Sequence, residues 1–240
     1  EFLAAFDETG KHFSSSFKDI ARSERIIRIV EGILKTWFDT SFNPRADIIG
    51  DDIYDMKDGL TEDGKMYGNN DVKGPSGRHG THVAGIIGAV RDNGLGIKGI
   101  ASHVKIMALR AVPDGDEYDK DVAYAIRYAA DNGARIINMS FGKGYSSPLY
   151  SEVHAAAEYA VSKGVLLVHA AGNDSADNDV VDNFPLRSFA GKDKIIKGWM
   201  EVGASSALRG KSLPAAFSNY GIQSVDLFAP GVEVLSSTPG

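Results

Sequence analysis

From about residue 95 onward, continuously apolar runs alternate with segments in which apolar residues recur at helical spacing. The runs VKIMALRAV at 104–112 and GVLLVHAAGN at 164–173 are almost continuously apolar, which is typical of strands buried on both faces of a sheet. Between them, residues 120–131 place apolar side chains at helical spacing, and Gly133 follows as a stop signal. Buried strands that alternate with helices of this length predict an α/β domain with a mostly parallel sheet.

Further elements continue the same alternation. The stretch at 134–142 is expected to form a strand and a loop, and a second helix should follow it. That helix is marked by Leu149, Val153, Ala156, Ala157 and Ala160. Apolar runs at 199–205 and 224–231 predict two more strands.

The first part of the chain has a different pattern. Helical spacing of Ile26, Ile29, Ile33 and Leu34 predicts a helix over residues 18–38. The stretch that follows is acidic and rich in glycine, and no buried-strand run occurs before about residue 75. We therefore expect residues 1–70 to be a helical and loop insertion packed on a body formed by residues 71–240.

Composition narrows the class of protein. A chain of 240 residues can form one large domain. Its formal charge of −6 argues against a nucleic-acid surface, which needs clustered Lys and Arg, and no apolar stretch is long enough to cross a membrane. With no Cys at all, neither a disulfide framework nor a thiolate zinc site can form.

The stretch GRHGTHVAG at 77–85 carries two histidines three positions apart, and three interpretations fit it. His79 and His82 could be ordinary residues at a helix start. The buried stripe of that helix would be Val83, Ile86, Ile87 and Val90. They could bind zinc, although the better helical spacing H-E-x-x-H is absent. His79 could instead be a general base whose second ring nitrogen is held by another group.

The motif HGTHVAG resembles the histidine motif of the subtilisin-like serine proteases, or subtilases. In that family the first histidine is catalytic, so the resemblance gives the catalytic role to His79 and leaves His82 as a structural partner. Other stretches resemble family motifs in the same order over residues 68–240. They are INMSFG at 137–142, AAGND at 170–174, FSNYG at 217–221 and LFAPGVEVLSSTPG at 227–240. The resemblance implies the subtilisin-like three-layer α/β fold with a mostly parallel sheet.

The resemblance also assigns site residues. Asn173 matches the asparagine that donates to the oxyanion, and two stretches match the walls of the peptide cleft. These substrate-binding residues are Gly115, Asp116, Glu117, Tyr118, Ser140, Phe141 and Gly142. Each also has a simple structural explanation, because Asn173 can be a turn residue, Ser140 a strand-end hydroxyl, and the acidic loop a solvated turn. If the resemblance holds, His79, Ser140 and Asn173 should border one cleft at the carboxyl edge of the sheet.

Two family motifs are missing from the chain. No D-[ST]-G element precedes His79, because Asp51 and Asp52 follow only a short apolar run, and no G-T-S-M-A element is present. We therefore expect an internal fragment that lacks the Asp strand and the Ser helix, with both catalytic residues outside it. Such a fragment should be inactive, and it should either be marginally stable as a monomer or cover its unfilled groove by self-association.

The resulting hypothesis is a fragment of a serine endopeptidase that hydrolyses peptide bonds by a Ser-His-Asp mechanism. The alternative is a pseudoprotease domain that binds peptides without cleaving them. The expected partner is a peptide or protein substrate, with no nucleic acid and no membrane span. No cofactor is identified, and calcium enters only through the family resemblance. The parent protein is expected to be secreted, periplasmic or on the cell surface.

Overall fold

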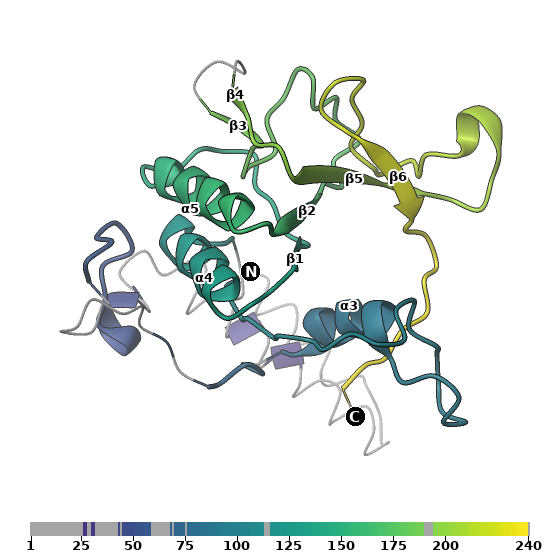
Figure 1. Cartoon of the computed structure of the whole chain (residues 1–240), viewed down its shortest axis with the longest axis horizontal. Helices are drawn as coiled ribbons and strands as arrows, with labels where there is room; N and C mark the ends of the chain where they lie inside the picture. Colours follow the sequence, from purple (N-terminus) through teal and green to yellow (C-terminus); the bar gives the residue numbers. More distant parts are fainter. Residues whose placement is uncertain are drawn as a thin grey trace, which may run out of the picture. The chain divides into compact units, whose positions relative to one another are not determined.

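The protein, seen here as a computed structural model, has an α/β architecture (Figure 1). The structure describes residues 26–27, 30–31, 43, 45–58, 68, 70–74, 76–112, 116–189 and 194–239. The chain divides into two compact units, Glu1–Asp52 and Ile53–Gly240.

The first unit is described only in part. Ile26, Ile27, Val30 and Glu31 are helical, and the rest of the helix predicted at 18–38 lies outside the described residues. A short π-helix, η1 (Arg45–Ile49), follows. Its end is marked by a hydrogen bond of 2.6 Å from the Gly50 N–H to the Arg45 carbonyl. No strand occurs among the described residues before residue 75.

The second unit contains a four-stranded sheet in the order β1-β2-β5-β6, and every neighbouring pair is parallel. The strands are β1 (Ile136–Met139), β2 (Leu166–Ala170), β5 (Trp199–Ser205) and β6 (Leu227–Pro230). A two-stranded antiparallel ribbon, β3 (Ser188–Phe189) with β4 (Lys194–Ile195), and the short 3₁₀ helix η2 (Gly210–Ser212) lie between the main elements. The parallel sheet predicted from the sequence is confirmed.

Two helices pack against each other on one side of the sheet, as Figure 1 shows. They are α4 (Asp119–Asp131) and α5 (Tyr150–Ser162). The first ends where the sequence predicts, just before Gly133, and both are followed by a glycine with the positive φ that suits this position, 83° at Gly133 and 81° at Gly164. Between these helices and the sheet lies the hydrophobic core. Its buried members include Val122, Ala123, Ile126, Met139, Val153, Ala156, Ala157, Ala160, Leu167 and Trp199.

The helix predicted behind the two histidines is α3 (Arg78–Gly88), which Figure 1 places apart from the sheet. The apolar stripe expected on it is not a buried one. Val83, Ile86 and Ile87 are half-buried and Val90 is exposed. Only Gly85 of this helix is buried.

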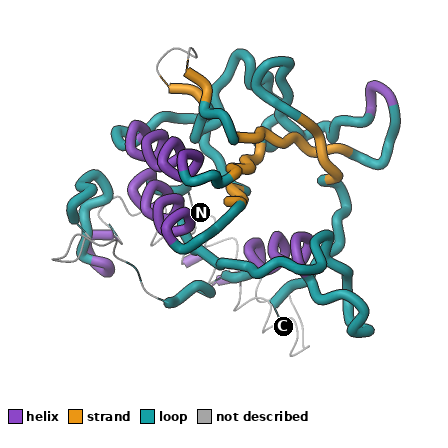
Figure 2. The backbone as a smooth tube through the Cα atoms, viewed as in Figure 1, coloured by secondary structure: helices purple, strands orange, loops and turns teal. Residues whose placement is uncertain are grey.

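The predicted strand at 104–112 is wrong. The chain between α3 and α4 contains no helix or strand among its described residues, and Figure 2 colours it as loop. Side chains that a central strand would bury are exposed: Val104 by 49%, Ile106 by 48% and Leu109 by 38%. The physical reason is pairing, since a strand needs a neighbour for its backbone groups and no described strand lies beside this segment. The described part of the chain holds no helix long and apolar enough to cross a membrane.

Candidate active site

The parallel register of β1 and β2 brings two predicted site residues to one edge of the sheet. Met139 pairs with His169, so the chain leaves both strands at the same carboxyl end. Ser140 follows β1 directly, and Asn173 lies three residues beyond the end of β2. Ligands of open parallel sheets bind at this kind of edge.

The three residues after β1 are those predicted to line one side of the peptide cleft. The Asn138 amide donates to the Ser140 hydroxyl at 2.8 Å, which is the local strand-end bond foreseen for this serine. Phe141 is half-buried and meets the His169 ring edge-on with 6.2 Å between ring centres. Gly142 packs against Asn183, whose side-chain oxygen would lie 2.6 Å from an added Cβ atom, so only glycine fits here.

The acidic loop before α4 is joined to the segment after β1 by hydrogen bonds and an ion pair. The Lys143 ammonium donates to the Glu117 carbonyl at 2.8 Å and to the Asp119 carboxylate at 2.6 Å. A second tie runs from the Tyr145 hydroxyl to Asp116 at 2.9 Å, and this bond raises the pKa of Tyr145 to about 12. The two expected cleft walls are therefore joined by a buried ion pair and an exposed hydrogen bond.

Individual residues of this loop differ in exposure. Glu117 is only 4% exposed, and burial raises the pKa of its carboxyl group. Asp116 is exposed and Tyr118 is half-buried at the N-cap of α4. Gly115 lies outside the described residues. The loop is thus not the fully solvated acidic turn that its composition allowed.

Asn173 lies in a loop whose backbone has a positive φ angle at the preceding residue. Gly172 before it has a φ of 108°, which favours glycine. Asn173 itself is exposed, and its side chain makes no hydrogen bond within the described part of the chain. Its amide is therefore free to donate to a ligand at the edge of the sheet.

His79 lies in the first turn of α3, where it is exposed. No hydrogen bond or ion pair joins it to any residue that the structure describes, Ser140 and Asn173 included. The structure therefore brings Ser140 and Asn173 to one edge but shows no contact that adds His79 to them.

His82 has a structural contact instead. Its Nε2 donates to the Val234 carbonyl at 3.1 Å, which fixes the proton on that nitrogen. The Ser236 hydroxyl donates to the His82 carbonyl at 2.5 Å, so the segment after β6 packs along α3. This contact gives His82 a structural role in the packing of α3. Among the described residues, no group of three or more His, Cys, Asp or Glu side chains could hold a metal ion.

Sequence reasoning missed a buried polar set beside this edge. His169 on β2 lies opposite Glu201 on β5, with 2.8 Å between Nδ1 and Oε1, and the Trp199 indole donates to the other Glu201 oxygen at 2.8 Å. Asn183 and Asn219 are also buried; the Asn183 amide donates to the Ala170 carbonyl at the end of β2, and the Asn219 side-chain oxygen accepts from the Asp174 N–H in the loop that carries Asn173. A histidine and a glutamate inside otherwise apolar strand sequences were the signals that could have revealed the first group.

Comparison with known proteins identifies the family. The profile described as the subtilase family matches residues 36–239. The chain belongs to the subtilase family. The match begins well before the motifs quoted from the sequence, so it also covers part of the segment expected to be an insertion.

Two curated subtilases and one solved structure show the extent of the similarity. The thermophilic serine proteinase of Bacillus sp. (strain AK1) is 38% identical over 163 residues, which are 68% of this chain and 36% of that protein. The cell wall-associated protease of Bacillus subtilis (strain 168) is 37% identical, over 71% of this chain and 17% of that protein. The structure of sphericase superposes with a TM-score of 0.55 at 32% identity, covering 67% of this chain and 55% of that one. The chain therefore spans about a third or less of these two curated relatives.

Proposed function

We propose that this chain is part of a serine endopeptidase and carries its histidine, its oxyanion donor and the walls of its peptide cleft. Membership of the subtilase family supports this, together with the placement of Ser140 and Asn173 at one carboxyl edge. The catalytic Asp and Ser are proposed to lie outside these residues, because neither a D-[ST]-G nor a G-T-S-M-A element occurs in the sequence.

The residues have separate roles in this mechanism. His79 accepts the proton of the nucleophilic serine and then donates it to the leaving amine. The exposed amide of Asn173 donates to the oxyanion of the tetrahedral intermediate. An extended substrate pairs with backbone groups of residues 115–118 on one side and of residues 140–142 on the other. The observation that carries this proposal is the free Asn173 amide beside the end of β1.

The chain by itself is proposed to be inactive, since it lacks the nucleophile. The test compares the 240-residue chain with the full-length parent, using a peptide substrate and a serine-directed fluorophosphonate. We expect turnover and labelling only with the parent, and His79→Ala in the parent should abolish both. Labelling of the 240-residue chain would place the nucleophile inside it and would overturn the proposal.

The alternative of a peptide-binding pseudoprotease would be favoured if the parent also lacks the two missing motifs. In that case the parent would bind peptide without labelling by the fluorophosphonate. We propose a secreted or cell-surface location for the parent, supported by a relative named as a cell wall-associated protease. Self-association of the 240-residue chain is supported by the exposed apolar side chains at 104–109.

A further inference from the structure

The loop that carries Asn173 rests on a second segment rather than on the sheet. Residues 216–220 run alongside it, and Asp177 and Tyr220 form a parallel bridge. The Ser175 N–H donates to the Phe217 carbonyl at 2.9 Å, and the Tyr220 N–H donates to the Ala176 carbonyl at 2.9 Å. The position of this loop is therefore set by residues 216–220, which lie beyond β5 in the sequence.

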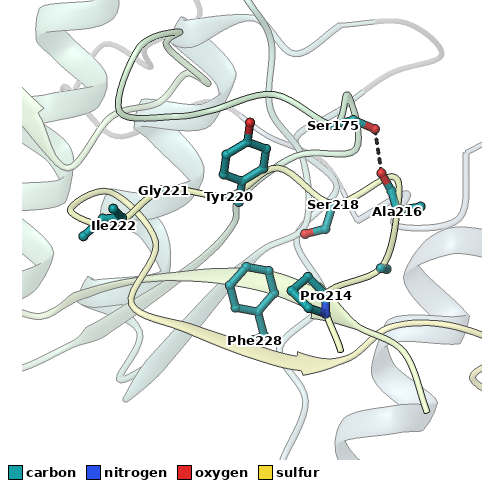
Figure 3. Close-up of a pocket in the computed structure, with 9 residues that line it drawn as sticks. Ser175, Pro214, Ala216, Ser218, Tyr220, Gly221, Ile222 and Phe228 are labelled. Atoms are coloured by element: carbon teal, nitrogen blue, oxygen red, sulfur yellow. Dashed lines mark hydrogen bonds between the residues drawn. The ribbon is translucent and has the colours of Figure 1, made fainter. Parts of the chain in front are cut away.

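Figure 3 shows one side of this contact at the rim of a pocket of about 460 Å³. The Ser175 hydroxyl donates to the Ala216 carbonyl at 2.7 Å, and Tyr220 and Phe228 also line the pocket. Ser218 beside them donates to the Asn219 carbonyl at 2.8 Å and accepts from the Ala204 N–H at 2.9 Å. Residues 216–220 are thus fixed to β5 as well as to the loop.

One residue of that segment, Asn219, bonds to the loop on both sides of Asn173, through its side chain after Asn173 and through its backbone before it. The Asn219 side-chain oxygen accepts from the Asp174 N–H at 2.8 Å and from the Ala176 N–H at 3.1 Å. The Asn219 backbone N–H donates to the Gly172 carbonyl at 3.0 Å. The peptide groups immediately before and after Asn173 are therefore bonded to a single residue that is 2% exposed.

A second asparagine orients the first. The Asn219 amide donates to the Asn178 side-chain oxygen at 3.0 Å, and the Asn178 amide donates to the Ala171 carbonyl at 2.8 Å. A Cβ atom on Gly172 would overlap the Asn219 amide, so the two residues are in direct contact. Every polar atom of the Asn219 side chain thus has a role in the shape of this loop.

We propose that Asn219 is the positioning residue that fixes Asn173 for oxyanion binding. This inference rests on the proposed function, because it assigns Asn219 no chemistry of its own. A preorganised donor costs no reorganisation when charge develops on the substrate, so a loop held from both sides is a better oxyanion site than a free one. Without the Asn219 oxygen, two N–H groups of the loop lose their acceptor, and the loop must rearrange to satisfy them.

The test uses the full-length parent with a peptide substrate. Asn219→Leu removes the acceptor at similar volume, and we expect kcat to fall about 100-fold with little change in KM, as for a misplaced catalytic group. Asn219→Asp keeps an acceptor for both N–H groups but loses the donor to Asn178, so it should recover part of the kcat that Asn219→Leu loses. The double variant Asn173→Ala/Asn219→Leu should be no slower than Asn173→Ala alone, because the two residues act as a unit.

Two controls keep the outcomes separate. Val153→Ala in α5, in the core and away from the loop, should lower stability without lowering kcat. If Asn219→Leu does not fold, Asn178→Leu should give a smaller loss of kcat in the same direction. In the 240-residue chain, amide hydrogen exchange at Asp174 and Ala176 should be faster in Asn219→Leu than in Asn219→Asp.

The two proposals fail in different ways. Unchanged kcat in Asn219→Leu, or additive losses in the double variant, would overturn the role of Asn219 while leaving Asn173 as the donor. An unchanged kcat in Asn173→Ala would overturn the oxyanion role of Asn173 itself, and with it the proposed function of this edge.

Discussion

Two regions of the second unit have similar apolar sequences and very different burial. In the sheet region, residues 116–230, the strands are covered by α4 and α5, and Leu167 is fully buried. In the α3 region, residues 70–112, the equally apolar run at 104–112 forms no strand, and Leu109 is 38% exposed. The difference shows that an apolar run stabilises the fold only where a neighbouring strand pairs with it and a helix covers its side chains, because only then are those side chains buried.

The sharpest test of this comparison removes one lysine from each region. Lys143→Met leaves Asp119 buried without its ion pair, and we expect the free energy of unfolding to fall by about 3–5 kcal/mol. Lys98→Met breaks an exposed pair with Asp92, so it should change stability by at most about 1 kcal/mol. Urea unfolding of both variants measures this, and equal losses would contradict the division into two regions.

A second pair of variants tests the apolar side chains directly. Leu167→Ala in β2 should destabilise by about 2–5 kcal/mol, because it leaves a cavity in the core. Leu109→Ala removes the same atoms from a half-exposed position and should cost about 1 kcal/mol or less. A large loss from Leu109→Ala would mean that the 104–112 run is buried in solution, by a second copy for example.

The smallest expected effect concerns pH. Burial raises the pKa of Glu117 in the folded state, so the native protein binds more protons than the unfolded chain and loses stability as pH rises above the unfolded value. Glu117→Gln should therefore be more stable than the wild type at pH 7, and this gain should disappear near pH 4. Thermal unfolding across that range gives the measurement.

Asp71 in the α3 region provides the opposite sign. Backbone N–H groups of Gly74 and Lys73 hold its pKa below the usual value, so its contribution is present at neutral pH and is lost as pH falls. The Asp71→Asn variant should therefore be less stable than the wild type at pH 7. A gain at pH 7 in both variants would show that lost negative charge, rather than burial of Glu117, is the cause.

Much of the sheet region could be predicted from the sequence because local pattern and tertiary packing agree there. The strand expected at 199–205 has those bounds, and the helix expected to start at residue 120 begins at Asp119. The run at 104–112 failed because its pattern shows which side chains are apolar but not whether a strand lies beside it. The ties from Lys143 to Asp119 and from Asn219 to Asp174 join residues 24 and 45 positions apart, which no local spacing can show.

The contact between α3 and the chain after β6 has a consequence for recombining this protein with other subtilases. A Cβ atom on Gly85 would overlap the hydroxyls of Ser236 and Ser237, so these three positions must be inherited together. A chimera with its crossover between residues 112 and 230 separates them, even where the crossover interrupts no motif. Crossovers that keep residues 77–88 and 231–239 from one parent should give far more folded progeny than crossovers that divide them.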